Sequence, residues 1–315
     1  MFKTLILNDC HLGVKRQAGT TEKSRAALEE YQLQEFEKLL NLPFNSLIIA
    51  GDLFDKRNVE EHIMERVIEL LRNKDCMIVL GNHDLGGKFD NTLSSAEFVA
   101  RLTKASIIKE PTYIESMNLY IVPHLFSQTE FDKAIANCPD NCTMLTHCNI
   151  DSGFATGDHS LNLTLEQINK LGKVIAAHEH HQRQYHNVTV LGNQFPSSIA
   201  DCQGPAKRAM YLDGTEVETW DGSDYKKFLY TDEFESTSAR FIEITGLCQP
   251  GEITDITKRI LKFRNQSEAF IIKNSVKVQQ KEERISIEAV THFNIIELFL
   301  EALPESTRKK VIRCV

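Results

Sequence analysis

The sequence predicts an α/β (α+β) fold in which two packed β-sheets are flanked by helices and followed by a small α+β unit. Three features of the 315-residue chain indicate this fold. Up to about residue 180, short apolar runs alternate with amphipathic segments, which is typical of a sheet covered by helices. From about residue 185 the chain is strand-rich with Gly, Pro and Asp turns, which predicts a second sheet that packs on the first. After a polar linker at 222–238, a strand, a helix and a strand are expected.

Five short apolar runs predict strands that are buried on both faces. They cover residues 3–8, 46–50, 76–80, 142–146 and 173–177. A polar residue that can bind a metal follows each run within one or two positions. Open α/β sheets place their chemistry at the carboxyl ends of the strands. We therefore expect these polar residues to meet on one rim.

Hydrophobic periodicity also predicts the helices and the later strands. Helices are expected at 22–42, 59–72, 96–104, 129–137 and 165–171, and later strands at 185–191, 209–212 and 216–220. The C-terminal unit should contain a strand at 240–245, a helix at 252–263 and a strand at 269–278. We divide the chain into a first domain at 1–222, a small α+β capping domain at 239–284 and a helical segment at 285–315.

The helix expected at 286–303 carries more apolar residues than one buried face can hold. Excess apolar surface commonly marks an interface. We interpret this helix as a segment that docks a partner, and an internal core helix is the alternative.

Composition indicates a globular protein of the cytoplasm. Hydrophobic residues make up 42% of the chain and charged residues 25%, both ordinary values for soluble domains. No apolar run approaches the roughly 18 residues of a membrane span, and the N-terminus enters a strand without a cleavable leader. The eight cysteines are scattered, which predicts buried free thiols. Cys138 and Cys142 lack the second pair that a thiolate metal site would need.

The net charge of −8 weighs against nonspecific binding of polyanions by the whole surface. The charge is uneven, because residues 225–315 hold 15 Lys and Arg against 13 Asp and Glu. Four basic residues of the helix expected at 252–263 and its end could contact phosphates, and a solvated helix face is the default alternative. They are Lys258, Arg259, Lys262 and Arg264.

Polar residues at the predicted strand ends offer ligands for two adjacent divalent metal ions. They are Asp9, His11, Asp52, Asn82, His147, His178 and His180. Two ions held about 3.5 to 4 Å apart can clamp a phosphate ester and activate a water molecule. Such a pair needs a bridging carboxylate, and Asp52 is the natural bridge because it follows a buried strand and a glycine. The residues of each D-x-H or H-x-H pair lie two apart, so both point to the same side of an extended segment.

The remaining polar groups complete this chemistry. Asn82 can bind a metal through its neutral amide oxygen. His83, its neighbour, points differently and is free to act as the general acid for the departing alkoxide. Imidazole, carboxylate and amide ligands without thiolate suit manganese, iron or zinc better than magnesium or copper. We expect two divalent ions, manganese first, with iron, zinc or magnesium as alternatives.

The motifs D-x-H, G-D, G-N-H-D, H and H-x-H, in this order, resemble those of the calcineurin-like metallophosphoesterase superfamily. The resemblance implies the family's αββα sandwich of two packed mixed sheets. It also implies a ligand set for each of the two metals. The first metal would be held by Asp9, His11, Asp52 and His180, and the second by Asp52, Asn82, His147 and His178. His83 matches the family's catalytic histidine.

Residues around the shared motifs resemble those of one branch of this superfamily, the SbcD nucleases of bacteria and phages. They are N-D-C-H-L-G at 8–13, G-D-L-F-D at 51–55 and F-P-S-S at 195–198. Asp55 stands where archaeal and eukaryotic relatives often carry a second active-site histidine, and Asp84 ends the G-N-H-D motif. Both are expected to contact the substrate or to support the ligands. Ala177 departs from the family's usual G-H-x-H, a change that the backbone should tolerate.

The resemblance implies a DNA nuclease subunit with exonuclease and endonuclease activity, acting in repair, recombination or replication. Its expected partners are DNA and an SbcC-like coiled-coil ATPase, with a homodimer inside a heterotetramer and no membrane contact. An enzyme alternative is a small-molecule or nucleotide phosphodiesterase on the same core. A scaffold that holds DNA ends for the ATPase without cutting is the other alternative.

Overall fold

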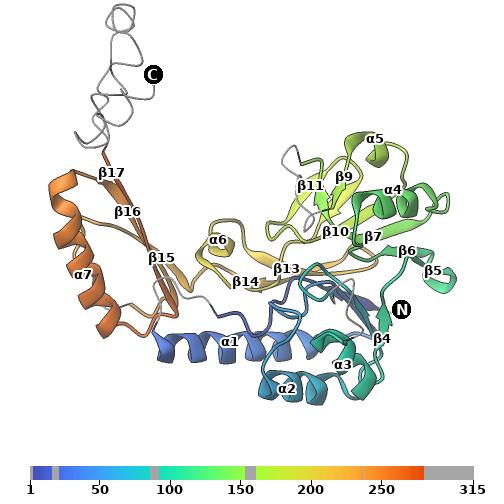
Figure 1. Cartoon of the computed structure of the whole chain (residues 1–315), viewed down its shortest axis with the longest axis horizontal. Coiled ribbons are helices and arrows are strands. Elements are labelled where there is room, and N and C mark those ends of the chain that lie inside the picture. Colours follow the sequence, from blue (N-terminus) through green and yellow to red (C-terminus); the bar gives the residue numbers. More distant parts are fainter. Residues whose placement is uncertain (1–2, 16–20, 86–91, 153–160, 236, 280–315) are drawn as a thin grey trace, which may run out of the picture. The chain divides into compact units, whose positions relative to one another are not determined.

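The computed structural model describes residues 3–15, 21–85, 92–152, 161–235 and 237–279 (Figure 1). Two six-stranded mixed sheets flanked by helices make up most of this part of the chain, so the predicted fold class is confirmed. Of the described residues, those up to 246 and those at 254–276 belong to one compact unit, and 247–253 with 277–279 belong to a second. The expected docking helix and the whole segment at 285–315 lie outside the described residues. The domain boundaries at 222 and 239 stay predictions.

The first sheet has the strand order β14-β13-β1-β2-β3-β4. Its strands are β1 (Thr4–Leu7), β2 (Ser46–Ala50), β3 (Cys76–Val79), β4 (Ser106–Ile108), β13 (Lys207–Tyr211) and β14 (Glu216–Trp220). β1 to β4 are parallel, and β13 and β14 add an antiparallel edge. Three helices pack on this sheet (Figure 1). They are α1 (Glu22–Leu40), α2 (Glu61–Leu71) and α3 (Ser95–Leu102).

The second sheet has the strand order β11-β12-β10-β7-β6-β5. Its strands are β5 (Thr112–Ile114), β6 (Leu119–Val122), β7 (Thr143–His147), β10 (Val174–Ala177), β11 (Arg183–Tyr185) and β12 (Val188–Val190). The four central strands are parallel, and β5 and β11 are antiparallel edges. The helices of this sheet are α4 (Gln128–Ala136) and α5 (Leu165–Ile168), and β8 (Asn149–Ile150) pairs with β9 (Asn162–Leu163) beside it.

Alternation along the strands builds the core in three apolar layers. Leu5 and Leu7 of β1 point to the helices of the first sheet, and Ile6 between them points the other way. Ile6 meets Leu145 of β7 and Ile175 of β10 in the layer between the sheets. Successive strand residues face opposite sides, so a run that is apolar at every position can fill two layers. The sheets therefore pack face to face through this middle layer.

Local signals place the helix ends close to the predicted positions. Thr21 starts α1, since its side chain accepts the Ser24 N–H in a capping box, and Ser94 starts α3 in the same way with Glu97. Helix α1 ends at Leu40 rather than at 42, because a proline at 43 disfavours helical backbone just before it. Such caps leave the loops that precede the helices free to carry site residues.

Three sequence predictions about strands are wrong. The five buried strands do not share one sheet, because β7 and β10 belong to the second sheet and β1 to β3 to the first. The strands expected at 209–212 and 216–220 join the first sheet instead of the second, as β13 pairs with β1. The run at 185–191 is split by a turn with His186 at φ +52°, which makes a hairpin of β11 and β12.

The expected polar linker at 222–238 contains a strand, β15 (Tyr225–Leu229). β15 pairs in parallel with β16 (Phe241–Cys248), and β17 (Ile271–Val278) completes a three-stranded sheet. Helix α7 (Ile253–Gln266) accompanies this sheet, as predicted. The five residues of β15 include Tyr225, Phe228 and Leu229, but the polar residues around them hid this short strand in the sequence. None of the helices in the described chain has both the length and the apolar composition needed to cross a bilayer.

Candidate metal centre

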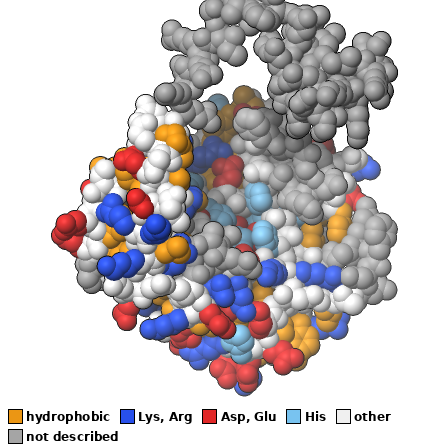
Figure 2. Space-filling view, turned by 60° about the vertical axis from the view of Figure 1, so that its left-hand side comes forward, with side chains coloured by type: hydrophobic (Ala, Val, Ile, Leu, Met, Phe, Trp, Pro, Cys, Tyr) orange, Lys and Arg blue, Asp and Glu red, His pale blue; other side chains and the backbone are white. Residues whose placement is uncertain are grey.

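The predicted ligands lie at the carboxyl ends of strands from both sheets. Asp9 and Asp52 follow β1 and β2 in the first sheet, while His147 ends β7 and His178 follows β10 in the second. Because the two sheets pack face to face, these two rows of strand ends meet. Figure 2 shows histidine side chains together in a hollow on one face of the molecule, beside acidic side chains.

Four of these residues have left-handed backbone conformations. The φ angles are +48° at Asp9, +44° at His11, +51° at Asp52 and +90° at His178. Residues other than glycine rarely adopt such angles, which cost about 1–3 kcal/mol each. Backbone bonds of 3.0 Å join the Asp9 N–H to the Gly51 carbonyl and the His11 N–H to the Asp52 carbonyl. Strain that the surrounding structure holds in place is typical of functional sites.

Two glycines let the backbone approach the ligands. A Cβ atom on Gly51, which has a φ of +97°, would lie 2.2 Å from Nδ1 of His147. A Cβ atom on Gly81 would lie 2.1 Å from Oδ1 of Asp52. Any larger residue would therefore displace a ligand, which explains the glycine in both G-D and G-N-H-D.

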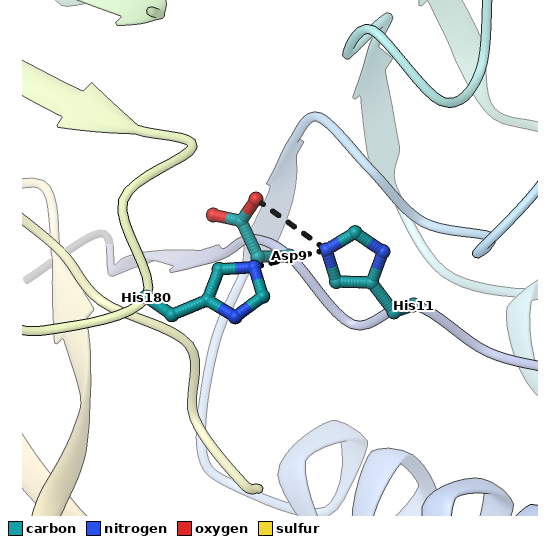
Figure 3. Close-up of side chains that lie close together, drawn as sticks. All are labelled: Asp9, His11 and His180. Atoms are coloured by element: carbon teal, nitrogen blue, oxygen red, sulfur yellow. Dashed lines mark hydrogen bonds and ion pairs between the residues drawn. The ribbon is translucent and has the colours of Figure 1, made fainter. Parts of the chain in front are cut away.

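The first ligand cluster consists of Asp9, His11 and His180 (Figure 3). The Nε2 atoms of His11 and His180 are 3.1 Å apart, and His11 Nε2 is 3.9 Å from Oδ1 of Asp9. Two ligands bonded to one ion at about 2.1 Å lie roughly 3 Å from each other. The separations in this cluster therefore suit three ligands of a single cation.

Buried side chains orient the ligands of the first cluster. Asp201 accepts a 2.7 Å hydrogen bond from Nδ1 of His180, which leaves Nε2 to face the cluster. Oδ2 of Asp9 accepts hydrogen bonds from Nδ2 of Asn8 (2.6 Å) and from the His178 N–H (2.9 Å). The other oxygen of Asp9, Oδ1, is buried and has no hydrogen-bond partner among the described residues. A buried carboxylate oxygen left this way is unfavourable unless a cation binds it.

The second ligand cluster consists of Asp52, His147 and His178, with Asn82 beside them. Nε2 of His147 is 3.1 Å from Oδ1 of Asn82 and 3.4 Å from Oδ2 of Asp52. Nδ1 of His147 donates a 3.0 Å hydrogen bond to the Ala50 carbonyl, so its Nε2 lone pair points into the cluster. These donors again suit one cation.

Asp52 belongs to the second cluster and also lies beside His11 of the first. Its Oδ1 accepts the His83 N–H at 2.9 Å and is therefore occupied. Its Oδ2 lies 3.4 Å from His147 Nε2, 3.8 Å from His11 Nε2 and 4.0 Å from His83 Nε2. A single oxygen thus faces both clusters, an arrangement that suits a carboxylate bridging two ions.

Burial and charge together set the protonation of the site. Burial opposes ionisation of Asp52, but His147, His11 and His83 outweigh it and hold the pKa of Asp52 well below its usual range. Burial alone would lower the pKa of His147, yet the Asp52 carboxylate raises it to about 9. Burial, aided by the charge of His147, lowers the pKa of His178 to about 4. The centre of the site is therefore an ionised carboxylate that attracts positive charge.

The residues present fit divalent cations. The donors are imidazole nitrogens, carboxylate oxygens and one amide oxygen, a set suited to transition metals of intermediate softness. Cys10 lies between two ligands but its thiol points to the Asn8 carbonyl, at 4.0 Å. Burial and the nearby Asp9 charge raise the pKa of Cys10 well above its usual range, so this cysteine stays protonated and does not contribute a thiolate.

His83 lies at the open side of the site. Its Nδ1 donates a 2.6 Å hydrogen bond to the Asp55 carbonyl, which leaves Nε2 directed toward the clusters. Its ring contacts the His11 ring edge-on, with 4.8 Å between the centroids. The His83 side chain is 39% exposed, against 5% for His11 and 0% for His147. A histidine in this position can meet a substrate that enters from solvent.

The two additional aspartates support the site from behind. Asp84 is buried, and its carboxylate accepts the backbone N–H groups of Leu53 and Phe54 (3.4 Å each) and of Gly81 (3.1 Å). Burial and the charge of Asp52 raise the pKa of Asp84 to about 7. Asp55 places Oδ1 at 3.7 Å from Nδ1 of His11, and its carbonyl holds His83. Both residues therefore position other groups.

Several supporting residues were not identified by the sequence analysis. Asp201 lies on the short helix α6 (Ile199–Cys202), and Ser197 donates to it through both its N–H (2.8 Å) and its hydroxyl (2.9 Å). Gln194 accepts the Asn8 N–H and donates to the Asn8 side chain, each at 2.9 Å. The F-P-S-S stretch at 195–198 was a partial signal, because its first serine binds Asp201.

The basic helix is engaged in part with its own surroundings. Arg259 donates to the Tyr230 carbonyl (2.9 Å) and the Asp232 carbonyl (2.6 Å) and lies over the ring of Phe234. Lys258 is 3.5 Å from the carboxylate of Asp255. A phosphate-contacting role for these residues stays a prediction.

Comparison with known proteins identifies a family. A family model described as calcineurin-like phosphoesterase matches residues 2–182. This range holds β1 to β10 and every residue of the two clusters, from Asp9 to His180. No curated protein matches the chain.

Proposed function

Because the chain belongs to the calcineurin-like phosphoesterase family and is a metal-dependent phosphoester hydrolase, we propose that it is a DNA nuclease subunit of the SbcCD type. The proposed substrate is the phosphodiester backbone at DNA ends, and the proposed process is repair, recombination or replication. The observation that carries the chemistry is the single Asp52 oxygen that faces both clusters, with Nε2 of His83 at 4.0 Å from it.

Two divalent ions, when bound, would clamp a phosphate ester and lower the pKa of a water molecule. The residues of the chain do the rest. Asp52 holds both clusters in register through Oδ2, and the Asp201 and Ala50 oxygens fix the imidazoles of His180 and His147. We propose manganese as the physiological ion, because the ligand set mixes imidazole, carboxylate and amide oxygen without thiolate.

His83 is proposed as the general acid. The Asp55 carbonyl accepts the Nδ1 proton of His83, so a second proton on the ring must be carried by Nε2, which faces the site. From there it can be transferred to the sugar oxygen that leaves when the P–O bond breaks. Its exposure at the open side is consistent with a large, flexible substrate rather than one enclosed in a pocket.

Residues outside the ligand set support the assignment to the SbcD branch. Asp84 ties the G-D-L-F and G-N-H-D segments together through three N–H groups. Ser197 of the F-P-S-S stretch orients Asp201 and through it His180. Asp84 therefore supports the segments that carry Asp52 and Asn82 of the second cluster, and Ser197 supports His180 of the first.

The proposed partners are an SbcC-like ATPase, docked by the segment at 285–315, and a second copy of the chain in a cytoplasmic complex. For the homodimer, two apolar residues one helical turn apart on α3 support an interface. Phe98 is 42% exposed and Leu102 is 52% exposed, and a second copy of the chain could cover this pair.

One experiment tests the proposal. Purified protein is incubated with manganese and linear duplex DNA, alone and with an SbcC-class ATPase, beside His83→Ala and the matched control His62→Ala. His62 is an exposed histidine of α2. It pairs with Glu29, which belongs to neither cluster. We expect metal-dependent cutting in the wild type and His62→Ala, and a loss of about 10²–10⁴-fold in His83→Ala.

Two outcomes contradict the DNA assignment. Hydrolysis of bis-p-nitrophenyl phosphate without any cutting of DNA, with or without the ATPase, would indicate a small-molecule or nucleotide phosphodiesterase. DNA-end binding with no hydrolysis of either substrate would indicate a scaffold.

A further inference from the structure

A pair of cysteines occupies the turn between α4 and β7. Cys138 follows the end of α4, Asn141 has a φ of +57°, and Cys142 precedes the first residue of β7. The turn is held in place by Asn118, which donates through Nδ2 to the Asn141 carbonyl (2.9 Å) and accepts the Thr143 N–H on its own carbonyl (3.0 Å). The two cysteines are therefore fixed relative to each other.

The two sulfur atoms are already in contact. Sγ of Cys138 and Sγ of Cys142 are 3.5 Å apart, and Cys142 Sγ also donates to the Pro139 carbonyl at 3.1 Å. A disulfide bond is about 2.0 Å long, so the two sulfurs need to approach each other by about 1.5 Å to form one. Among the described cysteines, Cys138 is the one that is only half-buried, whereas the others are buried.

A metal site is the competing explanation for two adjacent thiols. Thiolate sites for zinc hold four ligands. Among the described residues, the groups of three or more side chains that could hold an ion all lie at the metal centre described above and include neither cysteine. The pair at 138 and 142 therefore lacks the third and fourth ligands, and its geometry favours a covalent bond between the two sulfurs.

We propose that Cys138 and Cys142 form a reversible dithiol–disulfide site whose reaction partner is a small-molecule disulfide such as oxidised glutathione. Cys138, the accessible thiol, attacks one sulfur of the small disulfide, loses its proton and releases one small thiol. Cys142 then attacks the sulfur of Cys138, loses its proton and releases the second small thiol. The protein loses two electrons and two protons, and the small disulfide gains them.

The cross-link would join the end of α4 to the start of β7, the strand that ends at His147. Burial raises the pKa of Cys138 to about 12, so the first step should be slow at neutral pH and faster in mildly alkaline buffer. Because the closed loop is short, the expected rise in Tm is small, about 2–4 °C.

The test treats the full-length protein with oxidised glutathione in mildly alkaline buffer, alkylates the remaining thiols and digests the product with trypsin and a protease that cuts before aspartate. Cleavage before Asp140 separates Cys138 from Cys142 in the chain. The two fragments should stay joined only in the oxidised protein, and dithiothreitol should separate them. Cys138→Ser and Cys142→Ser should each abolish the joined species, while Cys76→Ser, which removes a buried cysteine of β3, should not.

Two results would overturn the proposal. One is a stable glutathione adduct on Cys138 while the thiol of Cys142 stays free and is alkylated in the next step. The other is full alkylation of both residues after conditions that oxidise free dithiothreitol completely. Both results can be read from the wild type alone, so they do not depend on the folding of the variants or on nuclease activity.

Discussion

The two ligand clusters are held by different kinds of structure. In the first cluster, His180 is oriented by the side chain of Asp201, and Asp9 by the side chain of Asn8 together with the His178 N–H. In the second, His147 is oriented by a backbone carbonyl, that of Ala50, and is packed against Gly51. A hydrogen bond from a side chain can be removed by one substitution, whereas a hydrogen bond to a backbone carbonyl is lost only when the local fold changes. The first cluster should therefore be open to gradual tuning, and the second should fail abruptly.

The largest effect should come from a substitution of Asp52. Because Asp52 faces both clusters, its loss should affect both of them. Asp52→Ala should lower kcat/KM on bis-p-nitrophenyl phosphate by more than about 10³-fold, because a shared ligand is lost from the site that stabilises the developing charge. The bound metal, counted by elemental analysis, should fall for both ions. Retention of two tightly bound ions in Asp52→Ala would contradict the bridging assignment.

The second cluster should fail through its backbone in Gly51→Ala. The new Cβ would lie 2.2 Å from the His147 ring at a φ of +97°, so either the ring or the strand end must shift. We expect a loss of activity of about 10²-fold or more, since misplacement of a catalytic group by about 1 Å can cost that much. Titration should show a larger loss of affinity for the ion of the second cluster, which His147 would bind, than for the ion of the first. If the affinity for the ion of the second cluster were unchanged, the segment around Gly51 would have relaxed without moving His147.

The first cluster should respond in graded steps to substitutions at Asp201. Asp201→Ala removes the partner of His180 Nδ1 and should weaken one metal by about 10–100-fold, the usual cost of losing such a support. Asp201→Asn keeps an oxygen that can accept a hydrogen bond from His180 Nδ1. Its metal affinity should lie between those of the wild type and Asp201→Ala. Isothermal titration with manganese measures both variants. Equal affinities for Asp201→Ala and the wild type would mean that His180 is held by other contacts.

These differences explain which features the sequence could predict. Each ligand follows a strand whose apolar run is visible locally, so Asp9, Asp52 and His147 were found with their strands. The supports were not, because the approach of Asp201 to His180 depends on tertiary packing across 21 positions. The division of strands between two sheets was missed for the same reason.

The pairing of β1 with β13 illustrates this limit. Leu5 lies opposite Tyr211 in the register of these strands, and no periodicity within either run encodes such a distant partner. Helix ends, by contrast, were predicted within two residues at α1, since the capping threonine and the following proline act locally. Local chemistry therefore located the ligands, and only the fold located what holds them.

The smallest effect should come from Lys207, a buried lysine of β13 on the first cluster's side. Its Nζ donates to the side chain of Asn193 and, at 3.4 Å, to the His180 carbonyl. Lys207→Met keeps the apolar stem but leaves both oxygens without this donor, which should cost about 1–3 kcal/mol of unfolding free energy. The metal affinity should fall by less than in Asp201→Ala, because the lysine holds the loop backbone and not the imidazole. Urea denaturation with and without EDTA separates the two effects. If Lys207→Met weakened metal binding more than Asp201→Ala, the backbone would be the main support of the first cluster as well, and the contrast between the clusters would disappear.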